Sequence, residues 1–97
     1  MQPIEVARLR DAVDAVNAQI VALLATRQRL TGEIGRHKAN AGMPVHIPER
    51  EQEMFLRLRE RASRHGLDWG TTEPVFTAIV AASRAHQREI APARAVS

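Results

Sequence analysis

One long amphipathic stretch, from about Ile4 to Asn40, constrains the fold of this chain more than any other feature. Its apolar side chains recur at intervals of three and four residues, the spacing of one face of an α-helix, and they are Leu9, Val13, Val16, Ile20, Leu23, Leu24, Leu30 and Ile34. A helix of this length extends for about 55 Å at 1.5 Å per residue. Since such a rod cannot fold back on itself, its apolar stripe must be buried against other helices or a second chain.

The long stretch is followed by a break and a second helical segment. The break is Asn40-Ala41-Gly42-Met43-Pro44. Proline is favoured in the first turn of a helix and glycine just past the last. We therefore expect the second helix to begin at Pro48 and to end near His65, with Gly66 as its stop.

A third helical segment follows the short loop Leu67-Asp68-Trp69-Gly70. Thr71 or Thr72 can cap this helix, with Pro74 in its first turn. The helix is expected to run to about Ile90, before a disordered tail at 91–97. The sequence thus predicts an all-α chain of three helices, one long and two shorter, over residues 4–40, 48–65 and 72–90.

Composition narrows the function classes for what we expect to be a single domain of 97 residues. The absence of cysteine excludes disulfides and thiolate metal sites. The four histidines lack metal-ligand spacing, so no metal site is predicted. Neither a signal peptide nor an apolar run of about 20 residues is visible, and we expect a cytoplasmic protein that does not enter the membrane.

The net charge of +3 favours a small anionic ligand over nucleic acid. Basic residues alternate with acidic ones instead of forming a block, and only three aromatic residues are present. A nucleic-acid surface would need a basic patch or a platform on which bases stack.

Polar residues interrupt the apolar stripe of each predicted helix. They are Arg27 and Lys38 in the first helix, Glu51 in the second, and Ser83 and Gln87 in the third. Unpaired buried charges are unfavourable, so each group requires a partner. An internal salt bridge, or a long side chain reaching water, can satisfy any one of them. Taken together, the four donors have only one carboxylate among them as an acceptor, and a bound anion is the natural complement.

The spacing of these residues is compatible with a site for a small molecule. Arg27 and Lys38 are eleven residues apart, so they share a helix face at a separation of about 16 Å. Ser83 and Gln87 are four residues apart and also share a face. Gly32 and Gly35 lie in the same part of the long helix; close approach of a ligand or a helix would explain them, and so would simple tolerance.

In its motifs the chain resembles the AroQ-class chorismate mutases, over roughly residues 9–87. The matching stretches are LRDAVDAVNAQIVALLATRQRLTGEIGRHKA, PVHIPEREQEM and AIVAASRAHQ. The resemblance implies an isomerase that converts chorismate to prephenate by a Claisen rearrangement without any cofactor. It also implies an intertwined homodimeric helical bundle. The product would serve aromatic amino acid biosynthesis, at the end of the shikimate pathway, or related secondary metabolism.

The resemblance further implies which residues bind the dianionic substrate. Arg27 would bind a carboxylate with help from Ser83, and Arg50 would support the carboxylate and Lys38 end of the pocket. Arg10 would reach in from the other subunit.

Three catalytic residues follow from the same resemblance. Lys38 and Gln87 would donate to the ether oxygen, and Glu51 would receive the ring hydroxyl. The loop would contact that hydroxyl through its backbone at Ile47.

The position of Arg10 connects the site to a dimer. Arg10 and Arg27 are 17 residues, or about 25 Å, apart on one helix, too far to hold the same small ligand. An antiparallel partner helix would bring the second chain's Arg10 to the first chain's Arg27. If the family resemblance fails, an i,i+4 pair of Arg10 with Asp14 is the alternative.

The loop before Arg50 departs from the family pattern and leaves the substrate open. The family commonly has PVRDxxRE where this chain has PVHIPERE. A similar loop occurs in the related isochorismate pyruvate lyases, although Glu51 and Ser83 differ from the residues of that branch. A mutase acting on 4-amino-4-deoxychorismate and a non-catalytic regulatory module are further alternatives. The sequence specifies neither the metabolic pathway nor control by a partner enzyme.

Overall fold

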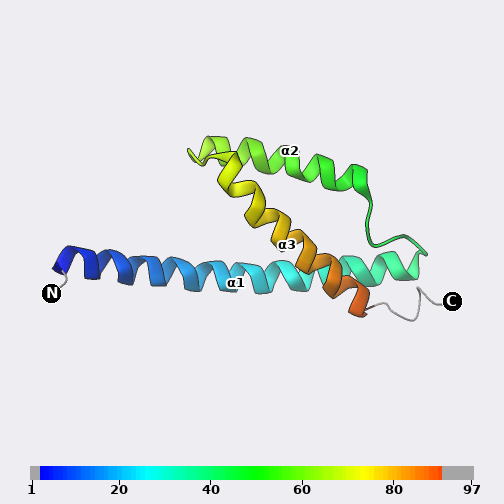
Figure 1. Ribbon diagram of the computed structural model, residues 1–97. Helices are drawn as coiled ribbons and strands as arrows, with labels where there is room; N and C mark the ends of the chain where they lie inside the picture. Colours follow the sequence, from blue (N-terminus) through cyan, green and yellow to red (C-terminus); the bar gives the residue numbers. More distant parts are fainter. Residues whose placement is uncertain (1–2, 91–97) are drawn as a thin grey trace. The chain divides into compact units, whose positions relative to one another are not determined.

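A computed structural model describes residues 3–90 of the chain, and these form three α-helices without a strand (Figure 1). Helix α1 is Ile4–Asn40, α2 is Pro48–Arg64 and α3 is Trp69–Ile90. The predicted all-α fold with a long first helix is confirmed, while the predicted tail at 91–97 lies outside the described residues. The chain divides into two compact units, an N-terminal unit of residues 1–30 and a C-terminal unit of residues 31–97.

The N-terminal unit consists of the first part of α1 and contains almost no buried side chain. Its described residues are exposed except for Arg27, which is half-buried. The apolar stripe is exposed as well: Leu9 is 67% and Leu23 68% accessible. Helix propensity is high because Ala, Leu and Arg dominate. An apolar stripe of this length on one helix cannot be buried within the unit itself.

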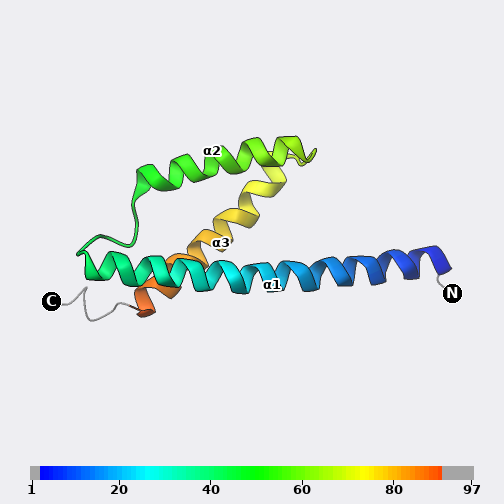
Figure 2. The same ribbon diagram turned by 180° about the vertical axis from the view of Figure 1, so that it is seen from behind.

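The C-terminal unit contains the end of α1, the loop at 41–47, α2 and α3 (Figure 2). A tight turn joins α2 to α3 at Gly66, whose φ of 70° is the left-handed conformation that glycine adopts without strain. The Leu67 N–H donates to the Ala62 carbonyl at 2.9 Å, as in a Schellman motif. Gly66 therefore follows the end of α2 as predicted. The last residue of the helix is Arg64, one residue before the expected end at His65.

The start of α3 differs from the prediction. The helix begins at Trp69, three residues before the predicted start, so Pro74 lies inside the helix and not in its first turn. Asp68 is the capping residue, because its carboxylate accepts from the Thr71 N–H at 3.2 Å. The hydroxyls of Thr71 and Thr72 instead donate to the Asp68 carbonyl, at 3.0 and 2.8 Å.

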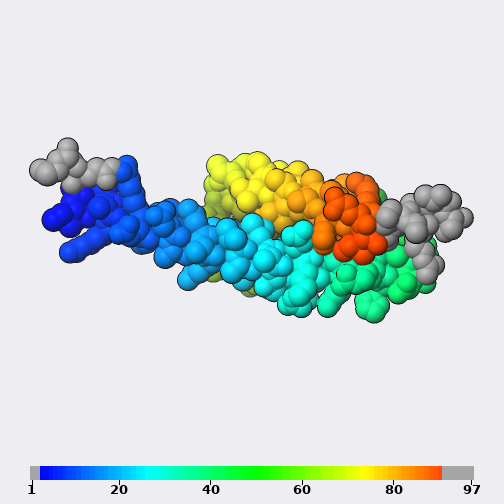
Figure 3. Space-filling model, turned by 90° about the horizontal axis from the view of Figure 1, so that it is seen from below, coloured from blue at the N-terminus to red at the C-terminus, as the bar shows by residue number. Residues whose placement is uncertain are grey.

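The C-terminal unit packs closely where α3 crosses the end of α1 (Figure 3). A Cβ on Gly35 would lie 2.9 Å from Gln87 Cγ, and one on Gly32 would lie 3.1 Å from Ile90 Cδ1. Close approach of a helix therefore explains both glycines. The apolar core is small, since Ala62 and Val80 are the only buried hydrophobic residues among those described.

Candidate functional site

A cavity of about 810 Å³ lies in the C-terminal unit, bordered by the end of α1, the loop and the facing sides of α2 and α3. Apolar side chains such as Ile34, Val80 and Met54 form part of its wall. The charged and hydroxyl- or amide-bearing side chains around it are Thr31, His37, Lys38, Arg50, Glu51, Arg57, Ser83, Arg84 and Gln87. Four cationic side chains and a single carboxylate thus face one cavity, a charge balance that favours an anionic ligand.

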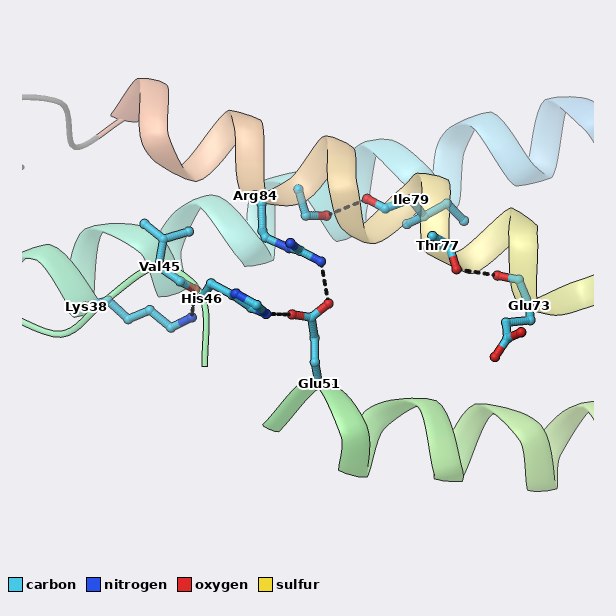
Figure 4. A network of polar contacts seen from close by, with 9 residues as sticks. Lys38, Val45, His46, Glu51, Glu73, Thr77, Ile79 and Arg84 are labelled. Atoms are coloured by element: carbon cyan, nitrogen blue, oxygen red, sulfur yellow. Dashed lines mark hydrogen bonds and ion pairs between the residues drawn. The ribbon is translucent and has the colours of Figure 1, made fainter. Parts of the chain in front are cut away.

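Two of the predicted donors are held by backbone carbonyl groups. The ammonium of Lys38 donates to the Val45 carbonyl at 2.9 Å, which links α1 to the loop (Figure 4). The amide of Gln87 donates to the Thr31 carbonyl at 2.7 Å, and Gln87 is only 6% exposed. An ammonium carries three N–H bonds and a side-chain amide two. Each group therefore retains donor capacity at the cavity while its position is fixed.

Glu51 occupies the centre of a three-residue network. One of its oxygens accepts from Arg84 Nη2 on α3 at 2.6 Å, and the other contacts Nε2 of His46 in the loop (Figure 4). Because Glu51 lies in the first turn of α2, its carboxylate also interacts favourably with the helix dipole. The network ties the loop, α2 and α3 together at the cavity.

Sequence reasoning missed Arg84 and did not include His46 in the site. His46 is exposed, but its ring contacts Glu51. Arg84 was absent from the predicted set because its partner lies 33 residues away, beyond any spacing rule within one helix. The signal that could have found it is the position of Arg84 beside Ser83 and three residues before Gln87. Arg57, which the sequence analysis did not single out, also borders the cavity.

Six of the eight predicted site residues border this cavity: Lys38, Ile47, Arg50, Glu51, Ser83 and Gln87. Ile47 also caps α2, its carbonyl accepting from the Arg50 N–H at 3.1 Å. The other two, Arg10 and Arg27, belong to the N-terminal unit. Arg10 is exposed there, whereas partial burial lowers the pKa of Arg27. Arginine nevertheless remains charged at neutral pH.

Within residues 3–90, no cluster of three or more histidine or carboxylate side chains is arranged to hold a metal ion. None of the three described helices combines the length and apolarity required to cross a membrane.

Comparison with known proteins gives a consistent family. The family described as chorismate mutase type II matches residues 9–88. The chorismate mutase of Methanocaldococcus jannaschii is 26% identical over 85 residues, which are 88% of this chain and 86% of that protein. The T-protein of Enterobacter agglomerans is 34% identical over 76 residues, 78% of this chain. The bifunctional chorismate mutase/prephenate dehydratase of Aquifex aeolicus is 39% identical over 54 residues, 56% of this chain. This chain spans 20% of the T-protein and 15% of the bifunctional protein.

Proposed function

The chain belongs to the type II chorismate mutase family, and we propose that it catalyses the rearrangement of chorismate to prephenate. One observation carries the proposal: Lys38 and Gln87, each fixed by a backbone carbonyl, border the same cation-rich cavity. We also propose that the product serves aromatic amino acid biosynthesis.

The rearrangement breaks the ether C–O bond and forms a C–C bond within one molecule, so no nucleophile or redox cofactor takes part. The protein has to select a compact conformer in which the two reacting carbons approach each other. It also has to stabilise the negative charge that develops on the ether oxygen.

Lys38 and Gln87 are proposed to donate to that oxygen. Both donors come from helices, α1 and α3, and both are already oriented by the Val45 and Thr31 carbonyl groups. Fixed donors stabilise the transition state more than the ground state, because the oxygen gains charge only as its bond breaks.

The remaining residues are proposed to bind the substrate. Arg27 and Arg50 would take the carboxylates, since a guanidinium pairs with a carboxylate through two parallel hydrogen bonds. Ser83 would assist at a carboxylate, and Glu51, with the backbone of Ile47, would receive the ring hydroxyl.

A second copy of the chain is proposed to complete the site with its Arg10. Two observations support an intertwined homodimer. The apolar stripe of the N-terminal unit is exposed, and fully burying such a side chain contributes about 1.5–3 kcal/mol. Arg10 and Arg27 stand about 25 Å apart along α1, so they cannot bind one small molecule from the same chain.

The test is to incubate the purified protein separately with chorismate, isochorismate and 4-amino-4-deoxychorismate and to identify the products. Prephenate from chorismate is the expected result. Salicylate and pyruvate from isochorismate would identify a lyase instead. An absence of turnover, together with tight binding of the dianions, would identify a regulatory module.

A further inference from the structure

Arg84 lies beside the carboxylate that is proposed to read the ring substituent of the substrate. Its Nη2 is 2.6 Å from Glu51 Oε1, and both residues border the cavity. The pair joins α3 to α2 and is only partly accessible, with 33% of the Arg84 side chain and 21% of the Glu51 side chain exposed. Water therefore screens the pair less than it would on an open surface.

The pairing changes what Glu51 can bind. A lone carboxylate in a partly buried cavity attracts a cation strongly, so it would accept an ammonium group on the ligand. With Arg84 in contact, the charges of the pair cancel, and the other Glu51 oxygen lies against Nε2 of His46. Lys38 and Arg50 border the same cavity and add positive charge. These positive charges would repel an ammonium group on the ligand, and that group would also lose its hydration on entering the cavity.

A hydroxyl group suits the same pair well. It can donate its hydrogen to Glu51 and accept a hydrogen bond from the Arg84 guanidinium, whereas an ammonium group can only donate. The pair therefore matches a neutral group that both donates and accepts.

We propose that Arg84 is a specificity-determining residue that makes the site select an enolpyruvyl dicarboxylate bearing a ring hydroxyl over one bearing a ring ammonium. The inference deepens the proposed mutase function and rests on it. Arg84 acts by neutralising Glu51 and by donating to the hydroxyl oxygen.

The experiment compares kcat/KM for chorismate and for 4-amino-4-deoxychorismate in three proteins: the wild type, Arg84→Gln and Arg84→Lys. Glutamine keeps a hydrogen-bond donor for Glu51 but removes the charge, whereas lysine keeps the charge. We expect the wild type to prefer chorismate, Arg84→Gln to lose that preference by at least about tenfold, and Arg84→Lys to retain most of it.

The matched control is Arg64→Gln, which removes an arginine from another ion pair. Arg64 pairs with Glu60 at 2.5 Å on the exposed side of α2 and does not border the cavity. Its substitution should leave the ratio of the two kcat/KM values unchanged, which separates a local effect at Glu51 from a general effect of losing charge.

Each outcome decides between the two proposals. A wild type that does not convert chorismate overturns the mutase function. A wild type that converts chorismate but uses the amine equally well, or an Arg84→Gln variant with an unchanged ratio, overturns only the role of Arg84. If Arg84→Gln fails to fold, Arg84→Met supplies a second neutral side chain. Methionine also removes Arg84 Nε. This buried nitrogen has no hydrogen-bond partner within residues 3–90, which destabilises the folded state.

Discussion

The two units of this chain distribute their polar and apolar groups in opposite ways. In the C-terminal unit three polar side chains of the cavity already have partners: Lys38 contacts a carbonyl of the loop, Gln87 one of α1, and Glu51 contacts Arg84. In the N-terminal unit the apolar stripe and Arg10 are exposed. The contrast supports the proposals that one chain supplies both donors to the reacting oxygen and that the N-terminal unit is completed by a second copy.

The largest effect is expected from charging the exposed stripe. Val13→Glu combined with Ile20→Glu places two carboxylates on the face that is proposed to be buried between subunits, where an unpaired charge is strongly unfavourable. We expect complete loss of the dimer and of mutase activity, measured by light scattering and prephenate formation. Ala18→Glu with Ala25→Glu, at the same spacing of seven residues on the opposite side of the helix, is the control. An active dimer carrying the first pair of substitutions would show that the stripe needs no partner.

The next effect concerns the division of the site between chains. Lys38→Ala removes a proposed donor to the ether oxygen and should reduce kcat on the order of 100-fold, as for an oxyanion-hole donor, while the dimer stays folded. Arg10→Ala should also inactivate the protein. Mixing the two variants places both lesions in one site of each heterodimer and leaves its other site intact. Statistical exchange should then restore about a quarter of wild-type activity. Confirmed subunit exchange without recovery would contradict a shared site.

A smaller effect is expected from the glycines at the crossing of α1 and α3. Alanine at either position favours the helix by roughly 1 kcal/mol. At Gly35, however, the new Cβ would press on Gln87 close to its backbone, at 2.9 Å from Cγ and 3.5 Å from Cα. At Gly32 it would meet Ile90 Cδ1, the end of a flexible side chain. We expect Gly35→Ala to lower kcat several-fold and Gly32→Ala to be nearly neutral. Equal kinetics in the two variants would mean that Gln87 can move without consequence.

The smallest effect is expected at the start of α3, where a substitution should lower the stability of the C-terminal unit without changing kcat. Asp68→Ala removes the cap of α3 and should cost about 1 kcal/mol, measured by denaturant unfolding. Asp68→Asn keeps a capping oxygen and should be close to wild type. Neither variant should change kcat, because Asp68 lies outside the cavity lining. A large loss of activity in Asp68→Ala would show that the start of α3 affects the site.

The sequence predicted the helices well where a single residue determines the boundary. Gly66 and Pro48 each define one end of α2, and the apolar period identified α1. The start of α3 was harder, because Asp68 and Thr72 are both good capping residues and only the observed hydrogen bonds distinguish them.

The candidate site shows the same limit. Lys38 and Gln87 could be found because each interrupts an apolar stripe within its own helix. The His46–Glu51–Arg84 network could not be found in that way, because its members come from a loop and two helices whose approach is a tertiary property. Periodicity relates residues three or four apart, and Arg84 and Glu51 are 33 apart.

The two main-chain anchors at the cavity have a consequence for sequence variation. Lys38 and Gln87 are positioned by the carbonyl groups of Val45 and Thr31, and every residue type carries a carbonyl. Substitutions at positions 31 and 45 can therefore change the shape and polarity of the wall without removing the anchors. The two proposed donors can therefore stay in place while the residues around them diverge, which would let one catalytic arrangement be fitted to different cavities.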